Sequence, residues 1–250
     1  MTSLSSDLRE ALAKVGTSTL TGVLNRRGLR SMTLYDVWPM RPEQPRMVGL
    51  AFTMRFIPSR EDMDGPTSSN RSMIQPQAME ECPPGYVLMI DSRGDSRAAS
   101  AGDLYVGRLK ARGAAGIVTD GGFRDTDGVF KTGLPAYHRR PSSPPSPIAH
   151  RPIDLNLPIA CGGVAVYPGD VIVGDVLYTY DTGAMVAEYD ADGKRHERFK
   201  GEPSPYRLDG RWKQRAESFV VAPDTGWLKT RPLSLESQGN WLLDRLFTGD

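Results

Sequence analysis

The sequence contains few of the residues that build covalent or metal-held scaffolds. Its 250 residues include 2 cysteines and 3 histidines. Cys82 and Cys161 do not form a CxxC pair and cannot make a disulfide framework, so we interpret both as free thiols in a reducing cytoplasm. The histidines are not spaced like metal ligands, which argues against a zinc site.

Long apolar runs and an excess of one charge are also missing. No stretch of about 18 apolar residues occurs, so no segment is expected to cross a membrane. The N-terminus lacks a basic region followed by an apolar one, so we expect no secretory signal. The formal net charge of +1 gives no reason to expect a nucleic-acid or membrane partner. With 39% hydrophobic and 24% charged residues, the composition is that of a globular protein with one sizeable core.

The N-terminal region shows two helical patterns. Asp7 with Glu10 resembles a capping box, and apolar residues follow at helical spacing. A second, shorter helix is predicted from about residue 18 to residue 27, with Gly28 as its stop signal. Composition and turn residues predict further elements: a strand at 48–57, a polar loop at 59–76, a short helix at 73–81, a strand at 134–138, an irregular proline-rich loop at 141–152, and a hairpin at 163–173 around Pro168-Gly169.

The middle of the chain gives the clearest pattern. Tyr86–Asp91 is a short and almost fully apolar strand. A helix is predicted at about 98–112, ending at Gly113, and a second apolar strand at 115–119. An apolar strand, a helix and another apolar strand form a βαβ unit, so the two strands should be parallel and covered by helix.

The character of the chain changes after Asp175. Residues 194–215 contain eight basic and three acidic residues, and no helix or strand pattern is visible from about 190 to 223. We therefore predict one domain over 1–175, followed over 176–250 by an atypical segment that is partly irregular, solvated and mobile.

Three ionisable residues are expected to meet at one edge of the βαβ unit. Asp103 lies near the start of the predicted helix, and Arg124 and Asp125 lie just after the second strand. A helix of about 11 residues carries the chain roughly 17 Å away, and a strand of about 6 residues brings it back roughly 20 Å. The meeting point is the carboxyl edge of the parallel strands, where open α/β sheets bind ligands.

These residue types suit the binding of a small 2-oxo acid together with a divalent cation. The backbone N–H groups of Gly102 to Tyr105, near the helix N-terminus, can hold a carboxylate. Arg124 can bind a carboxylate or 2-oxo group through two hydrogen bonds. Asp125 is a suitable oxygen ligand for Mg²⁺ or Mn²⁺, and Asp103 can hold one of the waters on the cation.

Each of these residues also has an ordinary structural interpretation. An Arg-Asp pair at a strand end is usually a surface turn or an ion pair. A carboxylate such as Asp103 in a first helical turn interacts favourably with the helix dipole without any further role. Gly121 and Gly122 can form a simple turn. The pattern alone leaves both interpretations open.

Several stretches of the chain carry a family resemblance. They are AGDLY at 101–105 and RGAAGIVTDGGFRD at 112–125, with supporting stretches at 46–55, 84–91 and 158–170. Over residues 8–175 the chain resembles the RraA-like family, which includes the class II 4-hydroxy-4-methyl-2-oxoglutarate/4-carboxy-4-hydroxy-2-oxoadipate aldolases. The family aldolases share an Asp, twenty residues, and then Arg-Asp, and Asp103, Arg124 and Asp125 have that spacing.

The resemblance implies a fold, a site and an assembly. The fold would be a swivelling β/β/α domain of the α/β class, assembled as a homotrimer or a dimer of trimers with active sites between subunits. Asp125 would bind Mg²⁺ or Mn²⁺ directly, and Asp103 would bind it through water. Arg124 and the backbone of Leu104 and Tyr105 would hold the pyruvyl part of a small 2-oxo acid substrate.

The leading hypothesis is a metal-dependent lyase that releases pyruvate from a 4-hydroxy-2-oxo acid by retro-aldol chemistry. Oxaloacetate decarboxylation passes through the same enolate and is the expected second activity. The alternative is a non-catalytic regulator that binds a ribonuclease or another protein, but the complete Asp/Arg-Asp set favours the enzyme. A methyltransferase is not supported, because no glycine-rich cofactor loop follows a first strand. The family pattern is lost after Asp175, so an acidic residue that some family aldolases bring from a neighbouring subunit has no assigned counterpart here.

Overall fold

The computed structural model describes residues 4–41, 43–64 and 73–175, together with three short strands at 187–189, 195–197 and 219–222. The chain divides into two units. The first contains residues 1–176 and 216–224, and the second contains residues 177–215 and 225–250. The mobility predicted for the segment after residue 175 concerns residues that lie almost entirely outside the described part of the chain.

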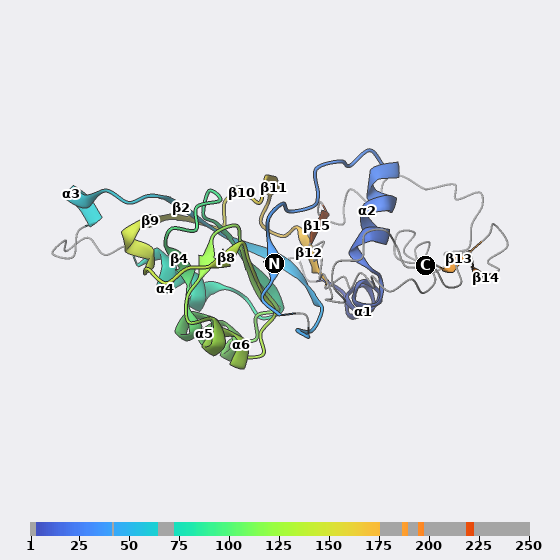
Figure 1. Cartoon of the computed structure of the whole chain (residues 1–250), viewed down its shortest axis with the longest axis horizontal. Helices are drawn as coiled ribbons and strands as arrows, with labels where there is room; N and C mark the ends of the chain where they lie inside the picture. The colour runs from blue at the N-terminus through green and yellow to red at the C-terminus, as the bar shows by residue number, and fades with distance from the viewer. Residues whose placement is uncertain are drawn as a thin grey trace, which may run out of the picture. The chain divides into compact units, whose positions relative to one another are not determined.

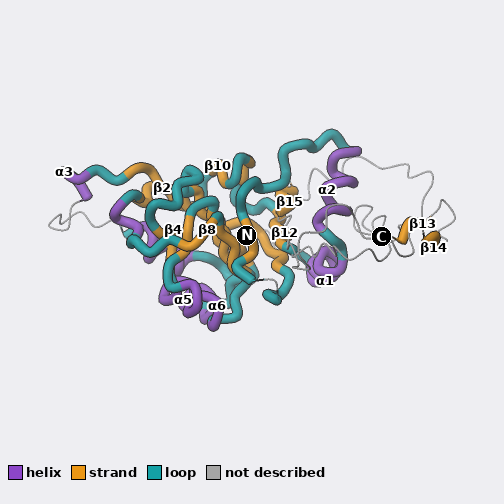
Figure 2. Tube along the Cα trace, in the orientation of Figure 1, coloured by secondary structure: helices purple, strands orange, loops and turns teal. Residues whose placement is uncertain are grey.

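In the described part of the chain, an eight-stranded sheet organises the first unit (Figure 1, Figure 2). Its strands lie in the order β1 (Trp38–Pro39), β7 (Ala136–His138), β5 (Gly116–Thr119), β3 (Tyr86–Asp91), β2 (Met47–Pro58), β12 (Val171–Gly174) and β15 (Phe219–Ala222), and β9 (His150–Leu155) pairs with the end of β2. The four central strands β7, β5, β3 and β2 run parallel. The outer strands are antiparallel to their neighbours.

Smaller groups of strands accompany this sheet. They are the parallel sheet of β4 (Ala99–Ala101), β6 (Gly122–Phe123) and β8 (Arg140–Pro141), the hairpin of β10 (Ile159–Cys161) and β11 (Val164–Val166), and, in the second unit, the hairpin of β13 (Ala187–Tyr189) and β14 (Arg195–Glu197). The β4-β6-β8 sheet positions the residues predicted to form the site, because β4 is followed by Gly102 and α5, and β6 leads into Arg124 and Asp125.

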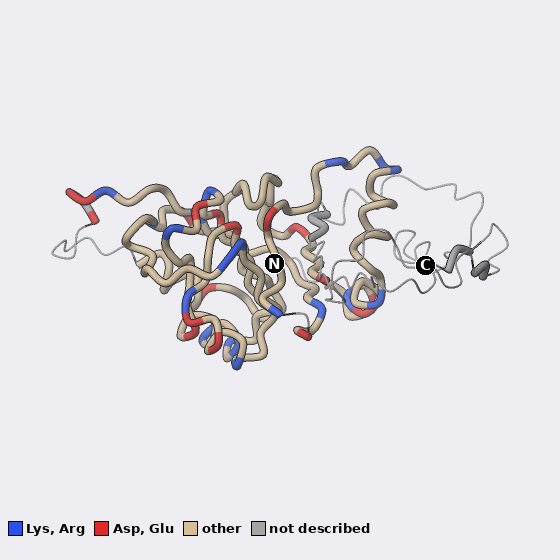
Figure 3. The backbone as a smooth tube through the Cα atoms, in the orientation of Figure 1, with Lys and Arg blue, Asp and Glu red and all other residues tan. Residues whose placement is uncertain are grey.

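The helices of the described residues are short. They are α1 (Ser6–Lys14), α2 (Thr17–Arg26), α3 (Glu61–Asp64), α4 (Ile74–Glu81), α5 (Asp103–Ala111), α6 (Thr126–Lys131) and a 3-10 turn at Ser146–Ile148. α5 packs beside both α4 and α6 (Figure 1). Basic and acidic residues are interspersed along α5 and α6 (Figure 3), where Lys131 pairs with Asp127. None of these helices combines the length and the apolar character that crossing a membrane requires.

Strand β3 supplies side chains to two separate cores. Leu88 and Ile90 lie in the core that α4, α5 and α6 cover, and Val87 and Met89 lie in the core that the β10-β11 hairpin covers. All are 0% exposed. Because successive side chains point to opposite faces, a strand that is covered on both faces is apolar throughout. The resulting layers of hairpin, sheet and helices confirm the predicted β/β/α fold.

The predicted βαβ unit is confirmed, with a correction to its helix. β3 and β5 pair in parallel. The helix does not begin at Ala98, because residues 99–101 form β4 and α5 begins only at Asp103. Gly102 has an extended backbone, with φ −138° and ψ −174°. Alanine favours helix, but pairing of β4 with β6 overrides that local preference.

The hairpin predicted for residues 163–173 is wrong in its pairing. Its turn forms, since Gly169 has φ +89° and the Asp170 N–H donates to the Tyr167 carbonyl at 3.1 Å. However, β11 pairs with β10, whereas β12 pairs with β2 and β15. The strands on the two sides of the turn therefore belong to different sheets. A turn signal locates a reversal of the chain without identifying the partners of the strands.

The capping box predicted at the N-terminus is also wrong. Ser5 caps α1, because its Oγ accepts a hydrogen bond from the Leu8 N–H at 3.3 Å. Glu10 pairs with Lys14 one turn later, and Asp7 adds a negative charge to the first turn. The helix itself forms as predicted.

Three segments predicted to be irregular contain regular structure. The proline-rich stretch 141–152 includes the 3-10 turn and the start of β9, an edge strand in which proline is tolerated. The stretch 190–223 includes β14 and β15. α3 lies within the predicted loop 59–76. The helix ending at Gly28, the strand at 48–57, the helix at 73–81, the strand at 134–138 and the two free cysteines are confirmed.

Gly116 in β5 is expected to tolerate no side chain. A Cβ there would lie 2.1 Å from Met47 Sδ and 3.0 Å from the Pro135 carbonyl oxygen. We expect Gly116→Ala to lower the free energy of unfolding by about 1–3 kcal/mol through overpacking, as measured by urea denaturation. Gly22→Ala is the control, because a Cβ at Gly22 in α2 meets nothing within 4 Å. It should raise stability by about 0.5–1 kcal/mol, and equal effects at the two sites would contradict the packing argument.

Candidate active site

The carboxyl ends of β4 and β6 meet at one point. The Arg124 N–H donates to the Ala101 carbonyl at 3.1 Å, just after both strands end. Gly102 lies close to the turn formed by Arg124 and Asp125. A Cβ on Gly102 would be 2.9 Å from Asp125 Oδ2 and 3.0 Å from Arg124 Cγ. The structure therefore brings the start of α5 against Arg124 and Asp125, and glycine at position 102 leaves room for both side chains.

Asp125 has an unusual backbone conformation. Its φ of +49° and ψ of +42° lie in the left-handed region, which few non-glycine residues adopt. The residue caps α6, and its carbonyl accepts a hydrogen bond from the Val129 N–H at 2.9 Å. Its carboxylate accepts a hydrogen bond from Arg124 Nε at 2.9 Å. Strained residues of this kind concentrate at functional sites, so the backbone marks this turn as a candidate.

Asp103 is the first residue of α5 and faces α6. Its Oδ1 accepts a hydrogen bond from the Leu104 N–H at 2.7 Å. A Cβ on Gly128 in α6 would lie 2.6 Å from Asp103 Oδ2. The carboxylates of Asp103 and Asp125 thus stand at the N-termini of two neighbouring helices, where the helix dipoles stabilise negative charge.

Some of the groups predicted to bind a ligand are used within the protein. The Leu104 N–H donates to Asp103, and Arg124 Nε donates to Asp125. The sequence left open whether Asp103 interacts only with its own helix end and whether Arg124 and Asp125 form an ordinary ion pair, and both of these interactions are present. The Arg124 side chain is nevertheless 41% exposed, and its Nη1 and Nη2 have no hydrogen bond or ion pair within the described ranges. Two nitrogens of the guanidinium, with four N–H donors, therefore remain available. The Tyr105 side chain is half-buried against the core beneath α5.

The two carboxylates fit a cation that keeps most of its water. Mg²⁺ normally takes only one or two protein carboxylates directly. Across the described residues, no group of three or more His, Cys, Asp or Glu side chains is placed to hold a metal. Asp125 and Asp103 are both partly exposed oxygen donors at adjacent helix ends. Their chemistry suits Mg²⁺ or Mn²⁺, whereas a structural zinc site would need four protein ligands.

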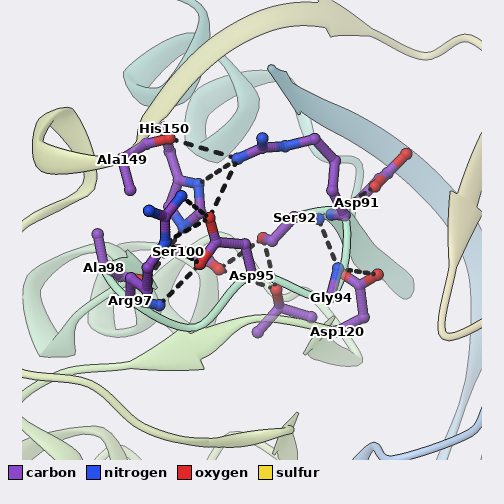
Figure 4. Close-up of polar contacts among 12 residues, drawn as sticks. Asp91, Ser92, Gly94, Asp95, Arg97, Ala98, Ser100, Asp120, Ala149 and His150 are labelled. Carbon is purple, nitrogen blue, oxygen red and sulfur yellow. Dashed lines mark hydrogen bonds and ion pairs between the residues drawn. The ribbon is translucent and has the colours of Figure 1, made fainter. Parts of the chain in front are cut away.

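Asp120, directly after β5, organises the loop that precedes β4. Its carboxylate accepts hydrogen bonds from the backbone N–H groups of Ser92 at 2.6 Å and Gly94 at 2.9 Å (Figure 4). It also accepts one from the Gly162 N–H at 3.3 Å. Burial raises the pKa of Asp120, and these backbone hydrogen bonds act in the opposite direction. The carboxylate is fully engaged in holding the turn, so its role is structural.

Hydroxyl groups fill the space between this turn and the candidate site. Ser92 Oγ lies 2.7 Å from Ser100 Oγ and 3.0 Å from Thr119 Oγ1. The Gly121 N–H donates to Thr119 Oγ1 at 2.9 Å. A Cβ on Gly121 would lie 2.6 Å from Ser100 Oγ, so glycine is needed here for the cluster to close. The cluster joins β3, β4 and β5 directly behind the site.

His150 anchors the same loop from the side of β9 (Figure 4). Its Nδ1 lies 3.1 Å from Arg93 Nη2, which can only donate, so Nδ1 accepts. Its Nε2 then donates to the Ala98 carbonyl at 3.0 Å. Burial lowers the pKa of His150, and the neutral ring is the form that makes both bonds. Nearby, the hydrogen bond from Arg97 lowers the pKa of Asp95 to about 2.

His138 supports the strand that carries Arg124. Its Nδ1 accepts a hydrogen bond from the Phe123 N–H at 3.3 Å, and the two rings stack with centroids 5.5 Å apart. Burial lowers the pKa of His138 to about 4. The imidazole must be neutral to accept this bond, since both nitrogens of the charged ring are donors. His138 is therefore a positioning residue for the end of β6.

Reasoning from the sequence missed these supporting residues. Asp120 left only a weak signal, as an acidic residue next to a strand end. His138 left none, because its partner Phe123 is 15 residues away and the contact depends on β7 folding beside β5.

Comparison with known proteins places the chain among two kinds of relative. The family model described as Aldolase/RraA matches residues 7–177. A protein of Halalkalibacterium halodurans named "Putative 4-hydroxy-4-methyl-2-oxoglutarate aldolase" is 34% identical over 137 residues, which is 52% of this chain and 63% of that protein. A protein of the same name from Ectopseudomonas mendocina is 36% identical over 92 residues, which is 36% of this chain and 56% of that protein. The chain thus spans less than two-thirds of the length of these relatives.

Solved structures provide the second kind of relative. Streptomyces coelicolor RraAS2, described as an unusual member of the RNase ES inhibitor RraA protein family, is 29% identical with a TM-score of 0.62, over 70% of this chain and 83% of that chain. The RNA-processing inhibitor RraA from Thermus thermophilis is 17% identical with a TM-score of 0.52, over 90% of this chain and 99% of that chain. At that identity the second likeness shows the fold alone.

The buried histidines should make the protein less stable in acid. His138 has a pKa of about 4 in the folded protein and about 6.5 when unfolded. The unfolded chain therefore binds the proton first, so stability is complete above pH 6.5 and is lost as pH falls toward 4. We expect this histidine alone to lower the free energy of unfolding by about 3 kcal/mol over that interval.

The measurement is urea denaturation at several values between pH 7 and pH 4.5. His138→Gln is the matched variant, because glutamine offers an acceptor oxygen that does not titrate. It should flatten the pH dependence of the unfolding free energy. A wild-type stability that is independent of pH below 6.5 would contradict the assignment of a buried neutral imidazole.

Proposed function

This chain belongs to the Aldolase/RraA family, and we propose that as a member it is a divalent-metal-dependent lyase that cleaves a 4-hydroxy-2-oxo acid and releases pyruvate. The observation that carries the proposal is the meeting of Arg124, Asp125 and the first turn of α5 at the carboxyl ends of β4 and β6. This point offers a guanidinium with free donors, two carboxylates and helix N–H groups within one small region. The aldolase names of the sequence relatives support the same reaction.

The reaction needs a group that stabilises negative charge on the pyruvyl oxygen. In a retro-aldol cleavage, the C4 hydroxyl loses its proton and the C3–C4 bond breaks. The bonding electrons move onto the pyruvyl fragment as an enolate, which then takes a proton at C3. Nη1 and Nη2 of Arg124 can hold the oxygen where this charge develops, because they are fixed donors that are not used elsewhere in the described residues. Oxaloacetate decarboxylation produces the same enolate by loss of CO₂ and is the proposed second activity.

The proposed cofactor is Mg²⁺ or Mn²⁺. When bound, the cation would polarise the 2-oxo group of the substrate. Asp125 would hold it directly and Asp103 through a water molecule. The hydrogen bond from Arg124 Nε to Asp125 gives the carboxylate a second task, since it also orients the guanidinium. The first turn of α5, from Gly102 to Tyr105, would bind the substrate carboxylate through its backbone, with the Leu104 N–H exchanging its present bond to Asp103 for one to the substrate.

A second candidate function is supported by the structural comparison with Streptomyces coelicolor RraAS2, which is described as belonging to a family of ribonuclease inhibitors. In this alternative the chain would bind a ribonuclease or another protein and would have no turnover. The free donors of Arg124 and the strained turn at Asp125 favour the enzyme, because a purely structural ion pair needs neither.

Arg124 should affect turnover more than substrate binding. The first turn of α5 would share the ground-state carboxylate, whereas Arg124 would act mainly on the developing enolate. We expect Arg124→Ala to lower kcat by about 10²–10³ with a smaller change in KM. Arg124→Lys should not restore the rate, because an ammonium cannot supply two coplanar donors. The assay is pyruvate release from a panel of 4-hydroxy-2-oxo acids and oxaloacetate, with Mg²⁺ and with EDTA.

Melting curves of both variants provide the control for folding. Arg124 is a partly exposed side chain at a strand end, so its loss should leave the melting temperature almost unchanged. No turnover by the wild type on any substrate of the panel, together with binding of a ribonuclease that is unaffected by Arg124→Ala, would support the regulator instead. Full activity in EDTA would rule out the metal.

Asp125→Ala separates the two tasks of that carboxylate. As a direct metal ligand, Asp125 should be needed both for activity and for any rise in melting temperature that Mg²⁺ causes. If Asp125 served only to orient Arg124, the variant would lose activity and keep the Mg²⁺-dependent rise. We expect both to be lost, as measured by thermal shift with and without Mg²⁺ and by pyruvate release. Asp127→Ala is the matched control, since Asp127 is an exposed carboxylate in α6 that pairs with Lys131.

A further inference from the structure

The hydroxyl of Ser142 is buried and has no hydrogen-bond partner among the described residues. The residue follows β8 and is 8% exposed. A buried hydroxyl that gives up its bonds to water costs free energy unless another group replaces them. Other hydroxyls near the site are satisfied: Ser92, Ser100 and Thr119 bond to one another, and Ser146 donates to the Ala99 carbonyl.

The backbone of Ser142 is fixed beside the strand that carries Arg124. Its N–H donates to the Phe123 carbonyl at 2.9 Å, which extends the pairing of β8 with β6. The Ser142 side chain lies over Gly122, because a Cβ on Gly122 would be 2.6 Å from Ser142 Cβ.

The register of β6 and β8 places Ser142 beside Arg124. The two strands pair in parallel with Phe123 opposite Pro141, and the residues that follow this pair are Arg124 and Ser142. Phe123 is 0% exposed and lies in the core beneath the sheet. The Ser142 side chain packs over position 122, two residues before Arg124. Arg124 therefore has Gly102, which follows β4, on one side and Ser142, which follows β8, on the other.

We propose that Ser142 is a further substrate-binding residue, whose hydroxyl donates a hydrogen bond to an oxygen of the same 2-oxo acid that Arg124 binds. This inference rests on the proposed function of the site. A serine hydroxyl can donate to a carboxylate or carbonyl oxygen, and a negatively charged acceptor makes the stronger bond. An oxygen of the bound 2-oxo acid would supply the hydrogen-bond acceptor that the Ser142 hydroxyl lacks among the described residues. Gly122 has no side chain, which leaves room for the Ser142 side chain to pack against it.

The test uses Ser142→Ala with Ser143→Ala as the matched control. Ser143 is the next residue and is exposed, so the two variants remove the same hydroxyl from adjacent positions. The first readout is the affinity for oxalate in the presence of Mg²⁺, measured by calorimetry, because oxalate has the shape and charge of the pyruvate enolate. The second is kcat/KM for pyruvate release, and the third is the melting temperature without ligand.

We expect Ser142→Ala to weaken oxalate binding and to lower kcat/KM by about 10- to 100-fold, which corresponds to the loss of one hydrogen bond to a charged oxygen. Its melting temperature should stay the same or rise, since the free protein loses a buried hydroxyl that had no partner. Ser143→Ala should change none of the three readouts.

Three outcomes would overturn the proposal. Unchanged oxalate affinity and kinetics in Ser142→Ala would show that the hydroxyl binds only water. A lower melting temperature with a parallel loss of binding would show that the hydroxyl holds the structure together. A wild type that binds no oxalate and has no turnover would remove the basis of both proposals. A wild type without turnover whose oxalate binding depends on Ser142 would end the lyase proposal while supporting the binding role of Ser142.

Discussion

Burial of both faces of β3 is the constraint on which the first unit depends. Val87 and Met89 pack toward the β10-β11 hairpin, and Leu88 and Ile90 pack toward α4, α5 and α6. Neither face can be opened without exposing one of the cores, so β3 must stay between β2 and β5 in its present register. The parallel direction follows, because each strand returns through a helix on the same side of the sheet.

This arrangement determines where chemistry can occur. The four parallel strands end at one edge, and the cluster of Ser92, Ser100 and Thr119 ties β4 to the ends of β3 and β5 there. Ahead of it, the short strands β4, β6 and β8 deliver the start of α5, the Arg124–Asp125 turn and Ser142 to the same region. Glycines at 102 and 122 allow these segments to approach closely, because a Cβ at either position would lie within 3 Å of a neighbouring segment. The candidate site thus lies at the ends of β4, β6 and β8, and its side chains are held by these paired strands.

The Arg124–Asp125 pair would combine a structural role with the catalytic one proposed for it. Without a ligand, the guanidinium donates one N–H to the carboxylate, and the four N–H groups on Nη1 and Nη2 have no partner in the described residues. Binding of a ligand to Arg124 should therefore cost little free energy, because the ligand adds hydrogen bonds to Nη1 and Nη2 and no buried ion pair has to break first. The strained backbone at Asp125 persists because the α6 cap and the bond from Val129 hold it.

The sequence by itself determined the βαβ unit and the candidate residues at its edge. Apolar runs, a glycine helix stop and the twenty-residue spacing from Asp103 to Arg124 are local features, and local features survive folding when both faces of a strand are buried. They were sufficient to predict the parallel pairing of β3 with β5 and the approach of Asp103 to Arg124 and Asp125, but not β4, β6 and β8, which form the sheet at whose end these residues meet.

Only the tertiary structure decided which strands pair with one another and which buried polar groups lack a hydrogen-bond partner. Residues 99–101 became a strand because β6 was available beside them, and β11 and β12 separated because each found a partner remote in the sequence. His138 gained its role only through contact with Phe123. Ser142 became distinctive because the fold buries its hydroxyl and offers it no acceptor within the described residues. Pairing and desolvation depend on contacts between distant segments, and no pattern within a single segment encodes them.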